Sequence, residues 1–242
     1  MSGHSKWKTI KHKKGIADAK RGKAFTKLIK EITIAARVGG GDPGANPRLR
    51  TLLEKAREIN MPIDNAQRAI KKGTGELPGQ SYEAYTYEGY GPGGIAVITE
   101  VLTDNKNRAI AELRHAFSKK GGVIGETNSV NWMFEKMGNI TAHKTDSTKN
   151  ITEDDLLENL LEYDIADITL SEDTFYITCN PKALDEVKKA VVDLGLKVEN
   201  AEIEWTAKNT MSLNDETSEQ ALDFLTFLEE LEDVQNVYTN LE

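Results

Sequence analysis

The sequence is poor in cysteine, proline and aromatic residues, and it lacks long apolar runs. Of its 242 residues, one is cysteine, six are proline and 7% are aromatic. The single Cys179 permits no internal disulfide, which favours a reducing compartment. No stretch approaches the roughly 18 uninterrupted apolar residues of a membrane-spanning helix, so no membrane partner is expected. The first residues also lack the apolar core of a secretory signal, which predicts a cytoplasmic protein.

Motifs for nucleotide chemistry are missing as well. No Walker A sequence occurs in the chain, so nucleotide hydrolysis has no support. The segment Gly89-Tyr-Gly-Pro-Gly-Gly94 has the spacing of a dinucleotide-binding loop. A predicted strand follows it, however, so no helix N-terminus would face a pyrophosphate. The segment therefore predicts a glycine-rich turn between two strands.

The histidines, the cysteine and the acidic clusters do not form the pattern of a metal or catalytic site. His4 and His12 stand among lysines, and His115 lies in a predicted helix without a ligand partner. Cys179 follows an apolar strand, where a small buried residue is common. The acidic run at 153–155 suits a helix N-terminus better than a pair of catalytic carboxylates. We therefore expect a protein that is not an enzyme, with no catalytic residue, cofactor, metal ion or small-molecule substrate.

Positive and negative charges are strongly separated along the chain. The formal net charge is −8, but residues 1–72 hold 18 Lys and Arg against 6 Asp and Glu. The first 72 residues therefore carry a net charge of +12, and the remaining 170 carry −20. Such asymmetry predicts an N-terminal region that binds polyanions, attached to an acidic body. The alternative is that these charges only solvate exposed faces.

Composition and periodicity divide the chain into a helical N-terminal part and a longer mixed part. Residues 1–22 form a basic arm with few apolar residues. Residues 23–73 predict a domain of three helices, the last capped by Gly73. Glycine and proline mark residues 74–81 as a linker.

Beyond the linker the pattern alternates between strands and helices. Strands are predicted at 85–88, 95–102, 165–170, 175–178, 198–206 and 234–238, and helices at 107–119, 152–161, 183–194 and 218–230. Residues 130–134 and 139–142 predict a hairpin. Because these elements do not follow a regular βαβ order, they indicate α+β modules rather than one doubly wound sheet.

The basic arm is the main candidate for binding nucleic acid. About eight side chains from Lys6 to Lys23 can neutralise phosphates, which predicts a salt slope of about −7 on duplex or about −6 on single strands. Trp7 and His12 can stack on unpaired bases, although Trp7 can equally anchor the arm on the helical domain. Because most of these cations are lysines, we expect contacts to the backbone rather than to base edges. The candidate nucleic-acid-binding residues are Lys6, Trp7, Lys8, Lys11, His12, Lys13, Lys14, Lys20, Arg21, Lys23, Arg68, Lys71 and Lys72.

The predicted helices 47–59 and 63–72 have the spacing of a helix-turn-helix motif. The basic residues of the second helix lie at its C-terminal end. Base-reading side chains usually lie at the N-terminal end, which here offers residues 63–65, an isoleucine, an aspartate and an asparagine. A duplex reader therefore remains an alternative to an RNA-binding surface.

Several segments in order resemble the signature of the YebC family, most specifically over residues 3–134. They are Gly3-His-Ser-Lys-Trp-Lys8, Ile10-Lys-His-Lys13, Gly40-Gly41-Asp42-Pro43, Asn60-Met-Pro-Ile-Asp64, Arg68-Ala-Ile-Lys-Lys-Gly73, Tyr87-Glu-Gly-Tyr-Gly-Pro92 and Thr103-Asp-Asn-Lys-Asn-Arg108. Two positions depart from the usual pattern of the family. Ala109 stands where the family often has threonine, and Asn128 stands where glycine is common.

The resemblance implies an α+β multidomain fold, with a helical N-terminal domain and two ferredoxin-like modules. It implies that residues 82–128 and 207–242 form one module, completed by the C-terminal segment, and that residues 129–206 form the other. Because the signature begins at Gly3, there is no room for a transit peptide, and a bacterial-type cytosolic member is expected.

The resemblance also implies a regulator of gene expression. Family members are described as probable DNA-binding transcriptional regulators, and mitochondrial relatives look like translational activators of cytochrome oxidase. Bacterial members are also tied to ribosomes stalled on proline runs. The lysine-rich arm favours a translation factor that binds ribosomal RNA, and a transcriptional regulator on duplex promoter DNA is the alternative.

Overall fold

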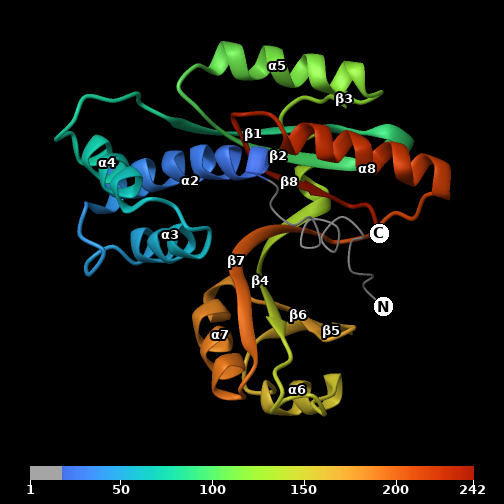
Figure 1. Ribbon diagram of the computed structural model, residues 1–242. Helices are drawn as coiled ribbons and strands as arrows, with labels where there is room; N and C mark the ends of the chain where they lie inside the picture. The colour runs from blue at the N-terminus through green and yellow to red at the C-terminus, as the bar shows by residue number, and fades with distance from the viewer. Residues whose placement is uncertain (1–17) are drawn as a thin grey trace. The chain divides into compact units, whose positions relative to one another are not determined.

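The computed structural model describes residues 18–242, with side chains from residue 22 onward (Figure 1). Within this range the chain divides into two compact units. One holds residues 18–130 and 213–238, and the other holds residues 131–212 and 239–242. The described strands form two four-stranded sheets, one in each unit. With its N-terminal helices, the chain therefore has the α+β multidomain architecture that the sequence predicts.

Three helices form the N-terminal domain of the larger unit. They are α2 (Asp18–Gly39), α3 (Pro47–Glu58) and α4 (Ile63–Thr74). Helices α3 and α4 both pack against α2. The core between them is made of apolar residues at helical spacing, chiefly Leu28, Ile32, Leu49, Leu52, Ala66 and Ala69. Helix α2 begins at Asp18, five residues before the predicted start, so the last residues of the predicted arm are helical.

The prediction that Gly73 caps the last helix is wrong. Helix α4 continues through Gly73 to Thr74, and Gly75 ends it in the left-handed region with φ of 84°. Gly73 instead allows α4 to approach α2. A Cβ atom on Gly73 would lie 2.4 Å from the Thr33 carbonyl oxygen and 2.8 Å from the Ala36 Cβ. The glycine therefore serves helix packing, for which any side chain is too large.

The first sheet has the strand order β3-β1-β2-β8. Its strands are β1 (Glu83–Tyr90), β2 (Ala96–Thr103), β3 (Val123–Ile124) and β8 (Val234–Thr239). The C-terminal strand β8 lies beside β2, so the end of the chain completes this sheet, as the family resemblance implies. The glycine-rich segment after β1 is the turn into β2, with the short 3-10 helix η1 (Pro92–Gly94), which confirms its interpretation as a turn.

Two helices accompany the first sheet, α5 (Lys106–Lys119) and α8 (Asp215–Glu229). The Phe117 ring on α5 meets the Phe224 ring on α8 edge to face, with centroids 5.0 Å apart. A Cβ atom on Gly89 would lie 2.6 Å from the Phe117 ring, so this strand glycine makes room for the aromatic pair. Asn128 has φ of 69°, a conformation that glycine adopts freely and asparagine tolerates, which accounts for an asparagine at this position.

The second sheet has the strand order β5-β6-β4-β7 and is antiparallel throughout. Its strands are β4 (Phe134–His143), β5 (Ile165–Ser171), β6 (Thr174–Cys179) and β7 (Lys197–Ala207), with α6 (Glu153–Asn159) and α7 (Leu184–Asp193) between them. The chain order β4-α6-β5-β6-α7-β7 with this sheet order is ferredoxin-like. Short 3-10 helices η2 (Asn131–Met133) and η3 (Pro181–Ala183) precede β4 and α7.

The predicted hairpin of residues 130–134 and 139–142 is absent from this part of the structure. Strand β4 runs without interruption from Phe134 to His143 and pairs with β6 on one side and β7 on the other. Gly138, which the sequence pattern placed in a turn, lies inside the strand. A Cβ atom there would lie 2.8 Å from the Cys179 Sγ, so the glycine permits close packing of the second core.

Candidate nucleic-acid interface

Most of the predicted interface precedes the described part of the chain. Residues Lys6, Trp7, Lys8, Lys11, His12, Lys13 and Lys14 lie outside the described residues. Lys20 and Arg21 belong to the first turns of α2, but their side chains also lie outside the described range. The structure therefore places four of the predicted residues, which are Lys23, Arg68, Lys71 and Lys72.

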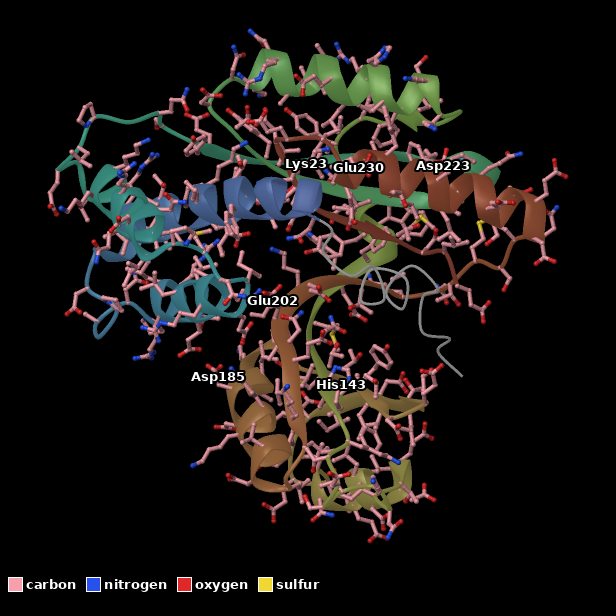
Figure 2. The ribbon with its side chains drawn as sticks, in the orientation of Figure 1. Lys23, His143, Asp185, Glu202, Asp223 and Glu230 are labelled. Atoms are coloured by element: carbon pink, nitrogen blue, oxygen red, sulfur yellow. The ribbon has the colours of Figure 1, made fainter. Side chains whose placement is uncertain are left out.

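Lysines of α2 contact the C-terminal end of α8. Lys23 Nζ donates a hydrogen bond to the Glu230 carbonyl oxygen at 3.1 Å, and the two residues lie side by side in Figure 2. Lys27 Nζ donates to the Glu229 carbonyl oxygen at 2.8 Å. The last carbonyls of a helix have no partner within it and carry partial negative charge, so ammonium groups stabilise them. Lys23 therefore makes a hydrogen bond within the protein while it remains exposed, and its contact with nucleic acid stays a prediction.

The next lysine on α2 enters a buried ionic cluster. Lys30 Nζ lies 2.6 Å from Asp233 Oδ1, and both side chains are about 5% exposed or less. The other carboxylate oxygen, Oδ2, accepts hydrogen bonds from Thr103 Oγ1 at 2.8 Å and from the Arg108 guanidinium at 2.9 Å. Arg108 also pairs with Asp104 at 2.8 Å. This cluster joins α2 of the helical domain to β2, α5 and β8 of the first sheet.

The cluster changes the acidity of Asp233. Burial by itself raises the pKa of this carboxyl group. Hydrogen bonds from Lys30, Arg108 and Thr103, together with the Lys30 charge, outweigh burial and hold its pKa below the ordinary value. Asp233 is therefore an ionised carboxylate fixed between two cations.

Three cations remain on the outer surface of α4. Arg68, Lys71 and Lys72 are exposed, and the two lysines follow Arg68 by three and four residues, so each lies next to Arg68 on the helix surface. None of the ion pairs found among residues 22–242 includes them. The aliphatic part of Lys72 lies against Gly79, where a Cβ atom would approach it at 3.0 Å. The packing of this stem directs the Lys72 side chain over the segment that follows α4.

The N-terminal end of α4 is poorly suited to reading bases. Its N-cap is Pro62, which makes no capping hydrogen bond through its side chain. Ile63 follows and is 69% exposed, and Asp64 is the acidic residue of the first turn. An exposed aliphatic side chain and a carboxylate do not provide the arginine or amide contacts that read purines. Asn65, the third residue of the helix, carries an amide, but it is partly buried. The first turn of α4 therefore presents neither an arginine nor a fully exposed amide to a base edge.

Exposed arginines on α3 were not among the predicted interface residues. Arg50 and Arg57 are exposed and seven residues apart, so they share one face. The sequence did contain a signal for them, since the apolar stripe of Leu49, Leu52 and Ala56 leaves both on the solvent side. Glu54 lies between them on the same face. This α3 face is therefore of mixed charge, unlike the C-terminal end of α4.

The buried thiol of Cys179 is unsuited to nucleophilic chemistry. Burial raises the pKa of this thiol to about 11, so it is protonated at neutral pH and is a poor nucleophile.

Between residues 18 and 242, His, Cys, Asp and Glu form no group of three that could hold a metal ion. In the same range no helix combines the length and apolar character needed to cross a membrane.

The fold and its charges define an α+β protein with a helical domain, two α+β modules, and exposed cations on α4 that pair with no acid among residues 22–242. Two family models match the chain. The model described as the TACO1/YebC protein N-terminal domain matches residues 5–76, and that described as the TACO1/YebC second and third domain matches residues 82–241. The chain belongs to the TACO1/YebC family.

Similar proteins match over nearly their whole length. A probable transcriptional regulatory protein of Desulfatibacillum aliphaticivorans is 54% identical over 242 residues, covering 100% of this chain and 96% of the relative. One from Chlorobaculum tepidum is 50% identical over 243 residues, covering 100% of this chain and 95% of the relative. The crystal structure of a conserved hypothetical protein from Aquifex aeolicus is similar with a TM-score of 0.84 and 45% identity, covering 96% of this chain and 95% of that one.

Proposed function

We propose that this protein is a non-enzymatic regulator of gene expression that binds nucleic acid through its basic N-terminal region. The physiological target in this proposal is ribosomal RNA, and the protein acts as a translation factor that relieves stalling, for example on proline runs. In this proposal the arm of residues 1–22 and the C-terminal end of α4 bind phosphates. The acidic modules orient the arm and the helical domain on the RNA. The likeness to the YebC family suggests the ribosomal role, and the residues support the phosphate-binding chemistry.

The observation that carries the proposal is the cluster of unpaired cations on α4. Arg68, Lys71 and Lys72 are exposed on one helix face and have no ion-pair partner among residues 22–242. Lys71 and Lys72 lie in the last turn of the helix, where the partial negative charge of the helix end favours basic side chains. Lysine binds phosphate as a point charge without reading sequence, which suits the backbone of a folded RNA.

A second candidate is a transcriptional regulator on duplex promoter DNA. The relatives from Desulfatibacillum aliphaticivorans and Chlorobaculum tepidum are named probable transcriptional regulatory proteins. Duplex DNA presents the same phosphates at high density, so the α4 cations can bind it as well. The helix end does not favour this candidate, because α4 begins with Ile63, Asp64 and a partly buried Asn65 rather than with an arginine or an exposed amide.

Sedimentation of cell extract through sucrose at rising salt separates the two candidates. A translation factor is expected to migrate with ribosomal fractions at low salt and to leave them as salt rises, because phosphate contacts release counterions. Absence from ribosomal fractions at low salt, together with specific binding to promoter DNA by the purified protein, would reverse the assignment.

Charge-neutralising variants test the surface itself. Replacing Arg68, Lys71 and Lys72 by glutamine is expected to flatten the salt slope for RNA binding by about 2, because each neutralised phosphate contributes about 0.7 on single strands. The effect should be similar for unrelated sequences, since phosphates carry no sequence information.

A matched control removes three exposed lysines from the second unit. Lys182, Lys189 and Lys197 can be replaced by glutamine with the same change in net charge. The control should leave the slope unchanged. If it flattens the slope as much as the α4 variant does, net charge rather than the α4 surface governs binding.

A further inference from the structure

Helix α5 is a cationic element in an otherwise acidic part of the chain. Residues 106–120 contain five Lys and Arg, one His and a single acid, Glu112. The rest of residues 73–242 contains eight Lys and Arg against 32 Asp and Glu. Such a local excess of positive charge is unusual in a segment with a net negative charge. The net charge of residues 73–242 as a whole conceals it.

Part of this positive charge is used inside the protein. Arg108 pairs with Asp104 and Asp233, and Lys120 pairs with Asp223 on α8 at 2.6 Å. These two cations hold α5 in place. Lys106, Arg114, His115 and Lys119 are all exposed, and they form no ion pair with the acids described in residues 22–242.

The packing of α5 determines which way these cations face. Leu113, Ala116 and Phe117 are buried on the side toward the first sheet and α8. Arg114 and His115 therefore lie on the outer side, where they are exposed. Ala111 and Ser118, each within four residues of them, are exposed and small. Small neighbours leave the guanidinium and imidazole groups open to a bulky ligand such as a nucleic-acid strand.

Aromatic rings lie beside two of these cations, Lys106 at β1 and Lys119 at Phe227 of α8, where Nζ is 5.3 Å from the ring centroid. Lys106 Nζ lies 4.9 Å from the centroid of the Tyr85 ring, and the Tyr87 ring follows with its centroid 6.3 Å from that of Tyr85. Burial raises the pKa of the Tyr87 phenol, and the positive charge of Arg114 offsets part of that rise. Basic side chains interleaved with aromatic rings are a pattern of surfaces that bind polynucleotides, where rings stack on bases and cations bind phosphates.

We propose that Tyr85, Lys106, Arg114, His115 and Lys119 form a second contact surface, the α5 surface, for the phosphodiester backbone of the bound nucleic acid. The inference rests on the proposed function and adds to it a second point of contact, outside the N-terminal domain. The occupant is a polynucleotide because the surface offers cations and a half-buried aromatic ring, while the rest of residues 73–242 is mostly acidic.

The test compares salt slopes of full-length variants on a structured RNA fragment of ribosomal sequence, and on a duplex DNA of random sequence. Replacing Arg114 and Lys119 by glutamine removes two phosphate contacts. The slope is expected to flatten by about 1.4 on single-stranded regions or about 1.8 on duplex. If wild type and variant bind equally at 1 M salt, these slopes predict that the variant binds more weakly than wild type at 0.1 M salt. The loss of affinity is about 25-fold on single strands and about 60-fold on duplex.

Two further variants keep the outcome interpretable. Arg114→Lys retains the charge and should retain the wild-type slope. Replacing Lys182 and Lys189 by glutamine gives the same change in net charge on the second unit and should have no effect on the slope. All of these side chains are surface groups of helices or short turns, and thermal unfolding followed by circular dichroism checks that each variant folds.

The outcomes distinguish the inference from the function on which it rests. If wild-type protein binds RNA or DNA and the Arg114 and Lys119 variant has the same slope and affinity, the α5 surface is wrong and the proposed function stands. If wild-type protein binds neither polymer at low salt, both fail. If the variant changes only self-association in sedimentation velocity, the surface binds a second copy of the chain and the inference is overturned.

Discussion

At the scale of single residues, the helical domain depends on small and polar side chains that close its turns. Asn46 is 5% exposed and makes three hydrogen bonds through its side chain. Its Nδ2 donates to the carbonyl oxygens of Ala35 at 2.9 Å and Gly40 at 2.8 Å, and its Oδ1 accepts from the Leu49 amide at 3.1 Å. One side chain thus satisfies both the C-terminal end of α2 and the N-terminal end of α3.

Asn46→Ala is therefore expected to lower the free energy of unfolding by about 2–3 kcal/mol, because it removes a cap and leaves buried carbonyls without a donor. Denaturant unfolding of the purified protein measures this change. Asn107→Ala on the exposed side of α5 is the control, and it should change stability by about 0.5 kcal/mol or less. Equal effects of the two substitutions would contradict the capping role of Asn46.

Two glycines of the helical domain give a second test at this scale. Replacing each by alanine should change the free energy of unfolding in opposite directions. Gly73→Ala is expected to destabilise the protein by about 1–3 kcal/mol, since its Cβ would collide with the Thr33 carbonyl oxygen 2.4 Å away. Gly22→Ala on α2 meets no atom within 4 Å and should stabilise by about 0.5–1 kcal/mol through helix propensity. Thermal unfolding of both variants decides the point, and a stabilising Gly73→Ala would show that α2 and α4 are not packed so closely.

At the scale of helices and strands, the cluster around Asp233 attaches the helical domain to the first sheet. Asp233→Asn is expected to lower the free energy of unfolding by about 3–5 kcal/mol, because it leaves the buried Lys30 ammonium without a counter-charge. The double variant with Lys30→Met should recover part of this loss, since no buried charge then lacks its partner. If the two substitutions simply add in denaturant unfolding, the pair is not coupled.

The same cluster predicts an acid sensitivity. The pKa of Asp233 is lower in the folded than in the unfolded protein, where it is about 3.9. The stabilisation is therefore fully present above about pH 4 and is lost as pH falls below that value through the folded pKa, because the unfolded chain binds the proton first. Stability measured between pH 6 and pH 3 should fall less in Asp233→Asn than in wild type. An identical acid profile would exclude this role.

Elements were predictable from the sequence where apolar residues keep a clear period. The start of α3 at residue 47 was predicted from the sequence, and the structure confirms it, with Asn46 as the N-cap. The helix predicted from residue 152 is α6, for which Thr152 is the N-cap. The hairpin at 130–142 failed because Gly138 and its neighbours resemble a turn locally. The glycine makes room for Cys179 on the paired strand β6, which is distant in sequence although adjacent in the sheet. A contact of that kind carries no local signal, and the same holds for Gly73.

From the sequence, the candidate site was predictable only as an excess of positive charge over the N-terminal region. The excess of lysine and arginine in residues 1–72 identified the N-terminal region, and Arg68, Lys71 and Lys72 are exposed as expected of such a surface. Lys23 has the same composition signal, yet its ammonium group contacts the end of α8. Only the three-dimensional structure shows this contact, and the Lys23 side chain stays exposed beside it. The cations of α5 were missed because the surrounding acids outweigh them in the sequence average.

At the scale of the whole molecule, the proposed binding of nucleic acid depends on the N-terminal arm. Seven arm cations remain when Lys23 is engaged at α8, which predicts a slope of about −5 on single strands from the arm alone. Replacing Lys11, Lys13 and Lys14 by glutamine should then flatten the slope by about 2–3 with little change between sequences. Fluorescence anisotropy on two unrelated RNAs measures this, and loss of binding to only one of them would indicate base reading instead.

The most direct test of the central claim is the salt dependence of wild-type binding to a ribosomal RNA fragment. Binding through the N-terminal cations predicts a linear plot of log K against log salt with a slope of about −5 to −6, or steeper where α4 contributes. Neither a slope shallower than about −2 nor an absence of binding at low salt is compatible with a protein that holds polynucleotides through its N-terminal cations.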